Sequence, residues 1–243
     1  MTALVVSGLS KSYGAVQAVR NVSFSVSSGE LVALIGPNGA GKTTCFNLLN
    51  GQLQPDAGEI NLDGRNLAGC PPREIWRMGV GRTFQITQTF GSMTVRENVE
   101  VALASHAGRL LAPIGSIRNS QADALLERVG MLDQAERPCA FLAYGDLKRV
   151  ELAIALANAP RLLLMDEPTA GMAPDERGSL MRLAAALAKS EGIAVLFTEH
   201  DVDVVFAHAD RVMVLYSGEL IASGPPEEIR RDPRVQEVYL GAA

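Results

Sequence analysis

Eight consecutive residues carry the strongest chemical signal in this chain of 243 residues. They match the phosphate-binding pattern G-x-x-x-x-G-K-[ST] and read Gly36-Pro37-Asn38-Gly39-Ala40-Gly41-Lys42-Thr43. Glycines let the backbone wrap so that N–H groups point at phosphate oxygens, and a helix starting near Gly41 adds its positive end. Lys42 supplies a positive charge, Thr43 supplies a hydroxyl ligand for Mg²⁺, and Thr44 is also expected to contact the phosphates. The pattern predicts nucleoside triphosphate binding rather than an ordinary glycine-rich turn.

Two adjacent carboxylates end a second apolar run. Leu162–Met165 reads as a buried strand, and Asp166 and Glu167 follow it directly. Ligands of open α/β sheets bind at the carboxyl ends of the strands, which is where this pair falls. We expect Asp166 to help hold Mg²⁺, directly or through water, and Glu167 to act as general base on the attacking water. A solvent-facing acidic turn is the alternative, and the phosphate loop upstream favours the catalytic interpretation.

Short apolar runs alternate with helical patterns around these two sites, which predicts an α/β fold with a mainly parallel, helix-covered sheet. The expected core strands are Leu31–Ile35, Leu162–Met165, Ile193–Thr198 and Arg211–Tyr216. The middle two are apolar almost throughout, as in strands that are buried on both faces. The expected core helices are Lys42–Leu49, Glu176–Ser190 and Val202–Ala207. This P-loop core places the phosphate loop between its first strand and its first helix.

The N-terminal part has a different pattern, with shorter apolar runs separated by turn residues. Its expected strands are Thr2–Leu9, Val22–Val26 and Glu59–Leu62. Asp63-Gly64 directly after the last of them is a hairpin signal. These features predict an antiparallel β subdomain beside the phosphate loop.

Strand signals fade between residues 88 and 159, where we expect a helical insertion. Thr94 and Glu97 fit a capping box, and Asn119–Val129 and Lys148–Ala157 have helical spacing, with a loop expected at Gly108–Ser116. We therefore expect one domain over 1–243. Its parts are an antiparallel sheet plus phosphate loop (1–87), a helical subdomain (88–159), the rest of the core (160–225) and a C-terminal helical tail (226–243).

Composition excludes several classes of protein. The net charge of −5 and the pI of about 5.3 lack the basic footprint of a nucleic-acid binder. The longest charge-free stretches, Thr43–Pro55 and Thr83–Val95, are 13 residues each, whereas a membrane-spanning helix needs about 20. The N-terminus has no signal pattern, and the three cysteines (Cys45, Cys70 and Cys139) read as reduced thiols of a cytosolic protein. We therefore expect no membrane span and no nucleic-acid partner.

Three further segments complete a known arrangement. They are Thr83-Phe84-Gln85, Pro168–Asp175 and Thr198-Glu199-His200-Asp201. Together with the phosphate loop and the paired carboxylates, they make the chain resemble the ATP-binding subunit of ABC transporters over essentially its whole length. The resemblance implies that Gln85 is the Q-loop glutamine and His200 the switch histidine. It also implies that Pro168–Asp175 contacts a second ATPase subunit.

The same resemblance assigns ligands for ATP and Mg²⁺. Tyr13 matches the aromatic residue that stacks on adenine, with Val19 nearby. Thr43, Gln85 and Asp166 would organise Mg²⁺ and water. The implied activity is Mg-dependent ATP hydrolysis coupled to transmembrane transport.

The family's signature, usually Leu-Ser-Gly-Gly-Gln, departs from that pattern here and reads Leu142-Ala143-Tyr144-Gly145-Asp146. In the family it opens a helix that meets the γ-phosphate held by the opposite subunit, which implies ATP contacts from Ala143, Tyr144, Gly145 and Asp146. Gly145 retains the close backbone approach. Ala143 lacks a hydroxyl whose hydrogen bond to a charged group is worth about 1.5–3 kcal/mol. Asp146 adds a negative charge near the triphosphate, which we expect Lys148 and Arg149 to offset, so hydrolysis at this signature is expected to be weak.

Leu-Ala-Tyr-Gly is similar to the ATP-binding subunits of branched-chain amino-acid importers. Ala170–Pro174 and the ending Glu237–Gly241 fit the same group. The resemblance implies a peripheral protein on the cytoplasmic face of the inner (plasma) membrane, which touches the membrane only through transmembrane permease subunits. The permease would contact the segment after Gln85, up to about Val99, and the second ATPase subunit would be identical or different.

Two other functions stay open. An ABC-type ATPase acting on nucleic acid or ribosomes would usually carry a coiled-coil insertion, zinc-ligand cysteines or a second ATPase domain, none of which this sequence shows. A regulatory nucleotide-binding module with weak hydrolysis is compatible with Ala143 and Asp146. Retention of Glu167 and His200 argues against it.

Overall fold

A six-stranded sheet forms the centre of the computed structural model, which describes residues 2–108 and 119–240. Its strand order is β10-β9-β3-β8-β7-β6. The bounds are β3 Leu31–Ile35, β6 Val80–Thr83, β7 Leu162–Asp166, β8 Ala194–Thr198, β9 Arg211–Tyr216 and β10 Glu219–Gly224. Neighbours pair in parallel except β10, which is antiparallel to β9. The mainly parallel sheet is confirmed. The sequence analysis missed β6 and β10, because both are edge strands that lack a continuous apolar run.

A separate antiparallel sheet is built by the N-terminal part, as expected. Its order is β2-β1-β4-β5, with β1 Thr2–Tyr13, β2 Val16–Ser27, β4 Ala57–Leu62 and β5 Arg65–Asn66. The hairpin turn between β4 and β5 is confirmed, with Asp63 and Gly64 at φ values of 47° and 80°. Strands β1 and β2 extend well beyond the predicted runs, because register shifts interrupt the alternation that marks a strand in the sequence.

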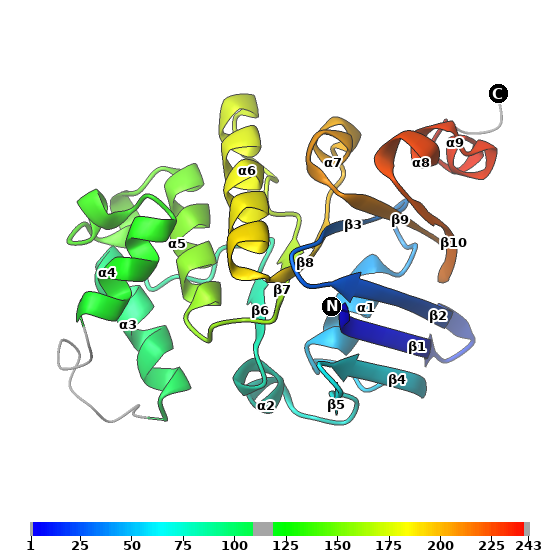
Figure 1. The fold of residues 1–243 in the computed structure, drawn as a ribbon, viewed down its shortest axis with the longest axis horizontal. Coiled ribbons are helices and arrows are strands. Elements are labelled where there is room, and N and C mark those ends of the chain that lie inside the picture. The colour runs from blue at the N-terminus through cyan, green and yellow to red at the C-terminus, as the bar shows by residue number, and fades with distance from the viewer. Residues whose placement is uncertain (1, 109–118, 241–243) are drawn as a thin grey trace.

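Nine helices occur in the described part of the chain. They are α1 Lys42–Leu49, α2 Pro72–Arg77, α3 Val95–His106, α4 Asn119–Arg128, α5 Tyr144–Leu156, α6 Pro174–Glu191, α7 Val202–His208, α8 Pro226–Arg231 and α9 Pro233–Leu240. Helices α3, α4 and α5 form the helical insertion and lie on one side of α6, opposite the antiparallel sheet (Figure 1). The capping box of α3 is confirmed, since Thr94 and Glu97 each accept the other's backbone N–H.

At three places the structure differs from the sequence analysis or does not describe the residues concerned. The sequence analysis missed α2, which is a short helix that starts with Pro72 after the N-cap Pro71. Helix α5 begins at Tyr144 rather than at Lys148, because the signature segment forms its first turn. Of the loop expected at Gly108–Ser116, Gly108 lies in a turn and 109–116 lie outside the described residues. The boundaries assigned to the four parts of the domain remain a prediction.

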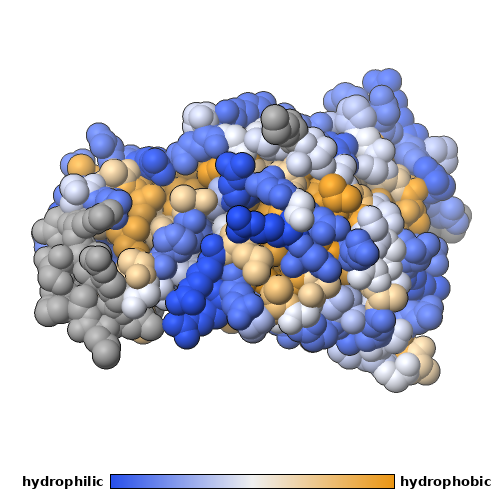
Figure 2. All heavy atoms as spheres, turned by 60° about the horizontal axis from the view of Figure 1, so that its bottom comes forward, coloured by the Kyte–Doolittle hydropathy of each residue, from blue (hydrophilic) through white to orange (hydrophobic). Residues whose placement is uncertain are grey.

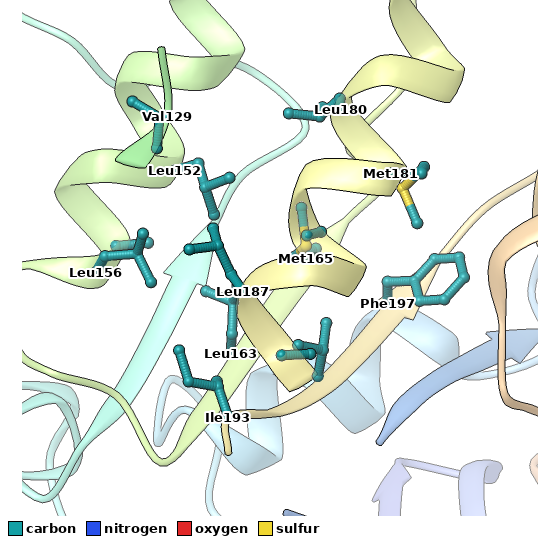
Figure 3. Packing of buried hydrophobic residues seen from close by; sticks show 14 of the residues in the cluster. Val129, Leu152, Leu156, Leu163, Met165, Leu180, Met181, Leu187, Ile193 and Phe197 are labelled. Atoms are coloured by element: carbon teal, nitrogen blue, oxygen red, sulfur yellow. The ribbon is translucent and has the colours of Figure 1, made fainter. Parts of the chain in front are cut away.

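Two apolar clusters pack on the opposite faces of the six-stranded sheet. Leu31, Ala33 and Ile35 of β3 belong to one cluster, and Val32 and Leu34 belong to the other. Figure 3 shows the first cluster, in which side chains of α5 and α6 pack against β7 and β8. Full burial of one such side chain contributes about 1.5–3 kcal/mol. This packing holds the carboxyl ends of β3, β7 and β8 at one edge of the sheet, where the chemistry-bearing residues lie.

No helix within residues 2–108 or 119–240 is long and apolar enough to cross a membrane.

Candidate functional site

The loop from Gly36 to Gly41 joins β3 to α1 and presses against two other backbone segments. A Cβ atom on Gly36 would lie 2.1 Å from the carbonyl oxygen of Leu215, and one on Gly41 would lie 2.2 Å from that of Ala18. Gly41 is also the N-cap of α1, with a left-handed φ of 107°. Only glycine fits such positions, and the N-terminus of α1 consequently faces the loop.

This loop forms one wall of a pocket of about 190 Å³. The pocket is lined by Ala18, Asn38, Gly39, Ala40, Gly41, Lys42, Thr43, Thr44, Glu167 and His200. The Nζ atom of Lys42 donates to the carbonyl oxygens of Gly36 at 2.6 Å and Pro37 at 3.1 Å. Burial lowers the pKa of Lys42, and the carboxylates of Glu167 and Asp166 act in the opposite direction. A lysine held inside a loop of backbone amides beside a helix N-terminus suits a phosphate chain.

Glu167 lies at the edge of this pocket with both carboxylate oxygens in hydrogen bonds. The Nε2 atom of Gln85 donates to its Oε2 at 2.6 Å, and Nε2 of His200 lies 2.7 Å from its Oε1. The backbone of Glu167 has a φ of 48°, and its N–H donates to Oγ1 of Thr198 at 3.1 Å. This uncommon backbone conformation fixes the carboxylate at the end of β7. The structure thus brings the three residues with expected catalytic roles into contact.

Asp166 is also hydrogen-bonded through both oxygens. Its Oδ1 accepts from the hydroxyl of Thr198 at 2.9 Å, and its Oδ2 accepts from Nη2 of Arg82 at 3.0 Å. Burial lowers the pKa of Arg82, and the ion pair with Asp166 opposes that shift. The sequence analysis missed Arg82. Its signal was a charged residue three positions before Gln85, in the strand beside β7.

A second residue that sequence reasoning missed is Glu199, whose buried carboxylate connects two segments of the site. Its Oε1 accepts from the backbone N–H of Thr169 at 2.8 Å and from its hydroxyl at 2.7 Å. Its Oε2 accepts from the backbone N–H of His200 at 3.2 Å. The loop Pro168–Asp175 is therefore tied to His200. A carboxylate between a buried strand and the histidine was the available signal.

Tyr13 and Val19, both expected beside adenine, have different environments. Tyr13 ends β1 and is 48% exposed, so its ring is free to stack on a base. Val19 is 1% exposed inside the cluster that includes the antiparallel sheet. Its side chain therefore faces the core, because the alternation along β2 turns it inward, and the expected position of Val19 near adenine stays a prediction. The neighbouring Ala18 lines the pocket instead.

The signature residues form the start of α5. Ala143 is the N-cap and provides no side-chain hydrogen bond. Gly145 packs against α6, since a Cβ atom there would lie 2.9 Å from Oε1 of Glu176. The Oδ2 atom of Asp146 accepts from Nε2 of Gln134 at 3.1 Å. None of these signature residues lines the phosphate-loop pocket, so one chain keeps the two motifs apart.

The charge of Asp146 is not offset by the two basic residues that follow it. Nζ of Lys148 donates to the carbonyl oxygen of Gln85 at 3.0 Å, and Nη2 of Arg149 donates to the hydroxyl of Ser179 at 2.8 Å. The expectation that Lys148 and Arg149 would compensate Asp146 is wrong. Successive positions on a helix point in different directions, so both basic groups contact other elements.

The expected Mg²⁺ ligands supply oxygen atoms at this edge of the sheet. Thr43 is exposed and lines the pocket, and Asp166 and Gln85 lie at the ends of the neighbouring strands β7 and β6. Within the described residues, no group of three or more His, Cys, Asp or Glu side chains could hold a metal. A hydroxyl and one carboxylate beside a phosphate pocket fit Mg²⁺, which is commonly bound by one or two carboxylates, substrate phosphates and water.

Comparison with known families identifies this arrangement. The family described as ABC transporter matches residues 19–170, which include the phosphate loop, Gln85, the signature and both carboxylates. The chain belongs to the ABC transporter family. A second family, described as branched-chain amino acid ATP-binding cassette transporter, matches residues 219–243 of this ABC cassette.

Individual ABC proteins are similar to this cassette over most of its length. The high-affinity branched-chain amino acid transport ATP-binding protein LivG of Salmonella typhimurium is 43% identical, and the match covers 99% of this chain and 98% of the relative. A crystal structure of the ADP conformation of an ABC transporter cassette is 31% identical, with a TM-score of 0.90 and all of both chains covered. A dimeric post-hydrolysis cassette bound to ADP and Pi is 26% identical, with a TM-score of 0.78 over 92% of this chain and 98% of that one.

Proposed function

We propose that this chain is the ATP-hydrolysing subunit that powers an ABC importer for branched-chain or related amino acids. The observation that carries hydrolysis is the placement of Glu167, whose oxygens are held by Gln85 and His200 at the edge of the phosphate-loop pocket. Binding ATP alone requires no carboxylate at this position. The solute class is supported by the similarity to LivG and by the family match at residues 219–243.

ATP binding uses the walls of the pocket. Lys42 leaves the carbonyl oxygens that it now contacts and moves to the β- and γ-phosphates, while Gly39–Thr44 supply backbone N–H groups. Tyr13 stacks on adenine. Thr43 and Asp166 would hold Mg²⁺ with the help of Gln85, and the ion would neutralise charge on the phosphates. Arg82 and Thr198 each bind one oxygen of Asp166 and hold this carboxylate in place, where it would help to bind the ion directly or through water.

Hydrolysis depends on a proton acceptor placed beside the γ-phosphate. Glu167 accepts a proton from the attacking water as the water oxygen bonds to phosphorus and ADP leaves. Gln85 and His200 keep the carboxylate oriented, and His200 also contacts the γ-phosphate. Positioned acid–base groups of this kind contribute about 10²–10⁴-fold to a rate.

A complete ATP site needs two ATPase subunits in this proposal. The signature residues do not line the phosphate-loop pocket of their own chain, so they are available to a pocket on another subunit. In a head-to-tail pair, each site would join one subunit's phosphate loop to the other's signature, and Pro168–Asp175 would lie at the contact. The dimeric state of a solved relative supports this arrangement.

Transmembrane permease subunits would dock beside the Q-loop, holding the cassette on the cytoplasmic face of the inner membrane. Ile86 and Phe90 are 76% and 58% exposed, within the segment expected to contact the permease. A groove of about 240 Å³ lies next to it and is lined by Asn50, Gln52, Pro72, Ile75, Trp76, Val80, Arg82, Phe84, Ile154 and Ala155. Figure 2 shows apolar patches among hydrophilic side chains on the side that lies at the bottom of Figure 1, where α2 is found. These features suit the docking of an amphipathic helix of the permease.

The acidic pI argues against nucleic acid as a partner.

A regulatory module with weak hydrolysis is the second candidate. It is favoured by one observation, that the start of α5 carries Ala143 without a capping hydroxyl and Asp146 with a negative charge. Both features would weaken the grip of the signature on a γ-phosphate.

The deciding experiment is steady-state ATP hydrolysis by the purified chain beside Glu167→Gln, with the oligomeric state followed by light scattering as ATP is added. We expect Mg-dependent turnover for the wild type and an ATP-stabilised dimer for the variant. Tight ATP binding without turnover or dimerisation would favour the regulatory module or a requirement for a different ATPase partner. Absence of ATP binding would refute the proposal.

A further inference from the structure

A buried ion pair on α5 lies outside the residues that the proposed mechanism uses. Lys148 and Glu151 are each 3% exposed, and Nζ of the first lies 3.3 Å from Oε2 of the second. Burying two charges costs several kcal/mol per ion unless further hydrogen bonds compensate the loss of water. The partners that compensate these two charges therefore indicate what the pair does.

Both side chains bind the backbone of the segment that carries Gln85. Nζ of Lys148 donates to the carbonyl oxygens of Phe84 at 2.7 Å and Gln85 at 3.0 Å. Oε1 of Glu151 accepts from the backbone N–H of Phe84 at 2.7 Å. Three hydrogen bonds from one helix thus hold three consecutive peptide groups, and each involves a charged side chain, which makes it stronger than a neutral bond.

The same helix begins with the signature. Tyr144, Lys148 and Glu151 are spaced four and three residues apart, so they lie on one face of α5. The hydroxyl of Tyr144 also reaches the carbonyl oxygen of Gln85, at 3.4 Å, and Nζ of Lys148 lies 5.6 Å from the centre of its ring. While the backbone of Gln85 is bound by α5, its side chain donates a hydrogen bond to Glu167 at 2.6 Å. A continuous set of contacts therefore leads from the signature helix to the catalytic carboxylate.

We propose that Lys148 and Glu151 are positioning residues that make the contact between Gln85 and Glu167 depend on where the signature helix lies. The inference rests on the proposed function, in which the signature serves the ATP held by the partner while Glu167 serves the ATP of its own chain. Since α5 is a rigid helix of 13 residues, its movement against the partner's ATP carries the Phe84–Gln85 backbone with it. The hydrogen bonds from Lys148 and Glu151 to this backbone thereby couple the two ATP sites to which one subunit contributes.

A purely structural role makes a different prediction. Replacing a buried ion pair by uncharged residues of similar volume is often neutral or stabilising. The double variant Lys148→Met/Glu151→Gln tests this, because it removes both charges and all bonds from the lysine. The glutamine keeps an oxygen that can accept the N–H of Phe84. The single variant Lys148→Arg keeps a cation with several hydrogen-bond donors. Lys189→Met is the matched control for the loss of a lysine, because this side chain on α6 is 64% exposed.

The experiment measures ATP hydrolysis and ATP binding, with the partner ATPase present where turnover requires it, and hydrogen exchange of the 83–88 segment. We expect kcat of the double variant to fall by about tenfold, the size of known coupling effects, with the Kd for ATP changed by less than about twofold. Lys148→Arg should recover most of kcat, and Lys189→Met should match the wild type. In the wild type, ATP should slow exchange in the 83–88 segment. In the double variant it should protect only the phosphate loop and α1.

Two results would overturn the inference without touching the proposed function. One is a wild type that hydrolyses ATP beside a double variant with unchanged kcat. The other is an ATP-dependent slowing of exchange at 83–88 that persists without the lysine. A wild type that does not bind ATP would instead remove the proposed function and this inference together.

Discussion

At the phosphate loop, the side chains that we propose act on ATP are already held by hydrogen bonds. Glu167 is bonded to both Gln85 and His200, and Lys42 is folded into its own loop. At the start of α5 the situation is reversed. Ala143 offers no side-chain bond, and among the described residues Asp146 is bonded only to the amide of Gln134.

The difference shows which part of the site is preorganised by the chain itself. Donors and acceptors fixed before the reaction require little reorganisation when charge develops, and the carboxyl edge of the sheet has this property. The signature offers a helix N-terminus and little else, so its contribution depends on contacts that another subunit completes. The variants below test this contrast, in order of decreasing expected effect.

Removing the lysine of the phosphate loop should have the largest effect. In Lys42→Met, two charge-assisted hydrogen bonds to phosphate are lost, worth about 3 kcal/mol or more together, so turnover should fall at least about 100-fold. Steady-state hydrolysis and calorimetric ATP binding measure the loss. Circular dichroism should remain unchanged, since the bonds of Nζ within the described part of the chain go to backbone carbonyls of its own loop. A variant with more than a tenth of wild-type turnover would contradict the preorganised phosphate loop.

His200→Ala should have the next largest effect, because Glu167 loses one of its two orienting partners. We expect kcat to fall by about 100-fold, the lower end of what acid–base groups contribute, while the Kd for ATP changes little. The split between kcat and Kd is the measurement, and single-turnover kinetics would supply it. Equal losses in both would mean that His200 binds ATP rather than orienting Glu167.

The signature should respond in the opposite direction. In Ala143→Ser/Asp146→Gln, a hydroxyl is gained and a negative charge near the triphosphate is removed, so ATP-dependent dimerisation and turnover should rise by about tenfold. Sedimentation of each variant in a Glu167→Gln background measures the dimer directly. No gain in either would show that this half of the site is complete as it stands.

Tyr13→Ala should show the smallest of these effects. Loss of stacking on adenine costs about 1 kcal/mol, so the affinity for ATP should fall about fivefold while GTP and ATP become harder to distinguish. Val19→Ala is the matched control. It removes two methyl groups from the core, and we expect a lower Tm with unchanged ATP affinity. Reversed results for the two variants would contradict the placement of Val19 inside the core.

The sequence predicted those parts of the fold and site that depend on local pattern. Helix α1 was predicted with its bounds, and the hairpin at Asp63-Gly64 and the capping box at Thr94 were found. Each of these signals lies within a few adjacent residues. That Gln85 belongs to this site was implied only by the family resemblance, and its contact with Glu167 was not predicted, since no local pattern places residues so far apart in contact.

What the sequence did not reveal depends on tertiary neighbours. Arg82 and Glu199 looked like ordinary charges beside strands, and their function became visible only through the atoms that they contact. The burial of Val19 was not predicted, because irregular pairing along β1 and β2 hides which side chains face inward. Lys148 was assigned to the wrong partner, because helical direction rather than sequence distance decides what a side chain reaches.

The glycines of the phosphate loop have a consequence for how such motifs should be interpreted. Gly36 and Gly41 have no space for a side chain because the carbonyls of Leu215 and Ala18 lie directly against them. Selection for folding alone would keep these two glycines. A descendant of this cassette that lost ATP hydrolysis would therefore still display them, whereas Glu167, which serves the chemistry, would be free to change. In a diverged homologue, the carboxylate after β7 is a better marker of retained catalysis than the glycine-rich loop.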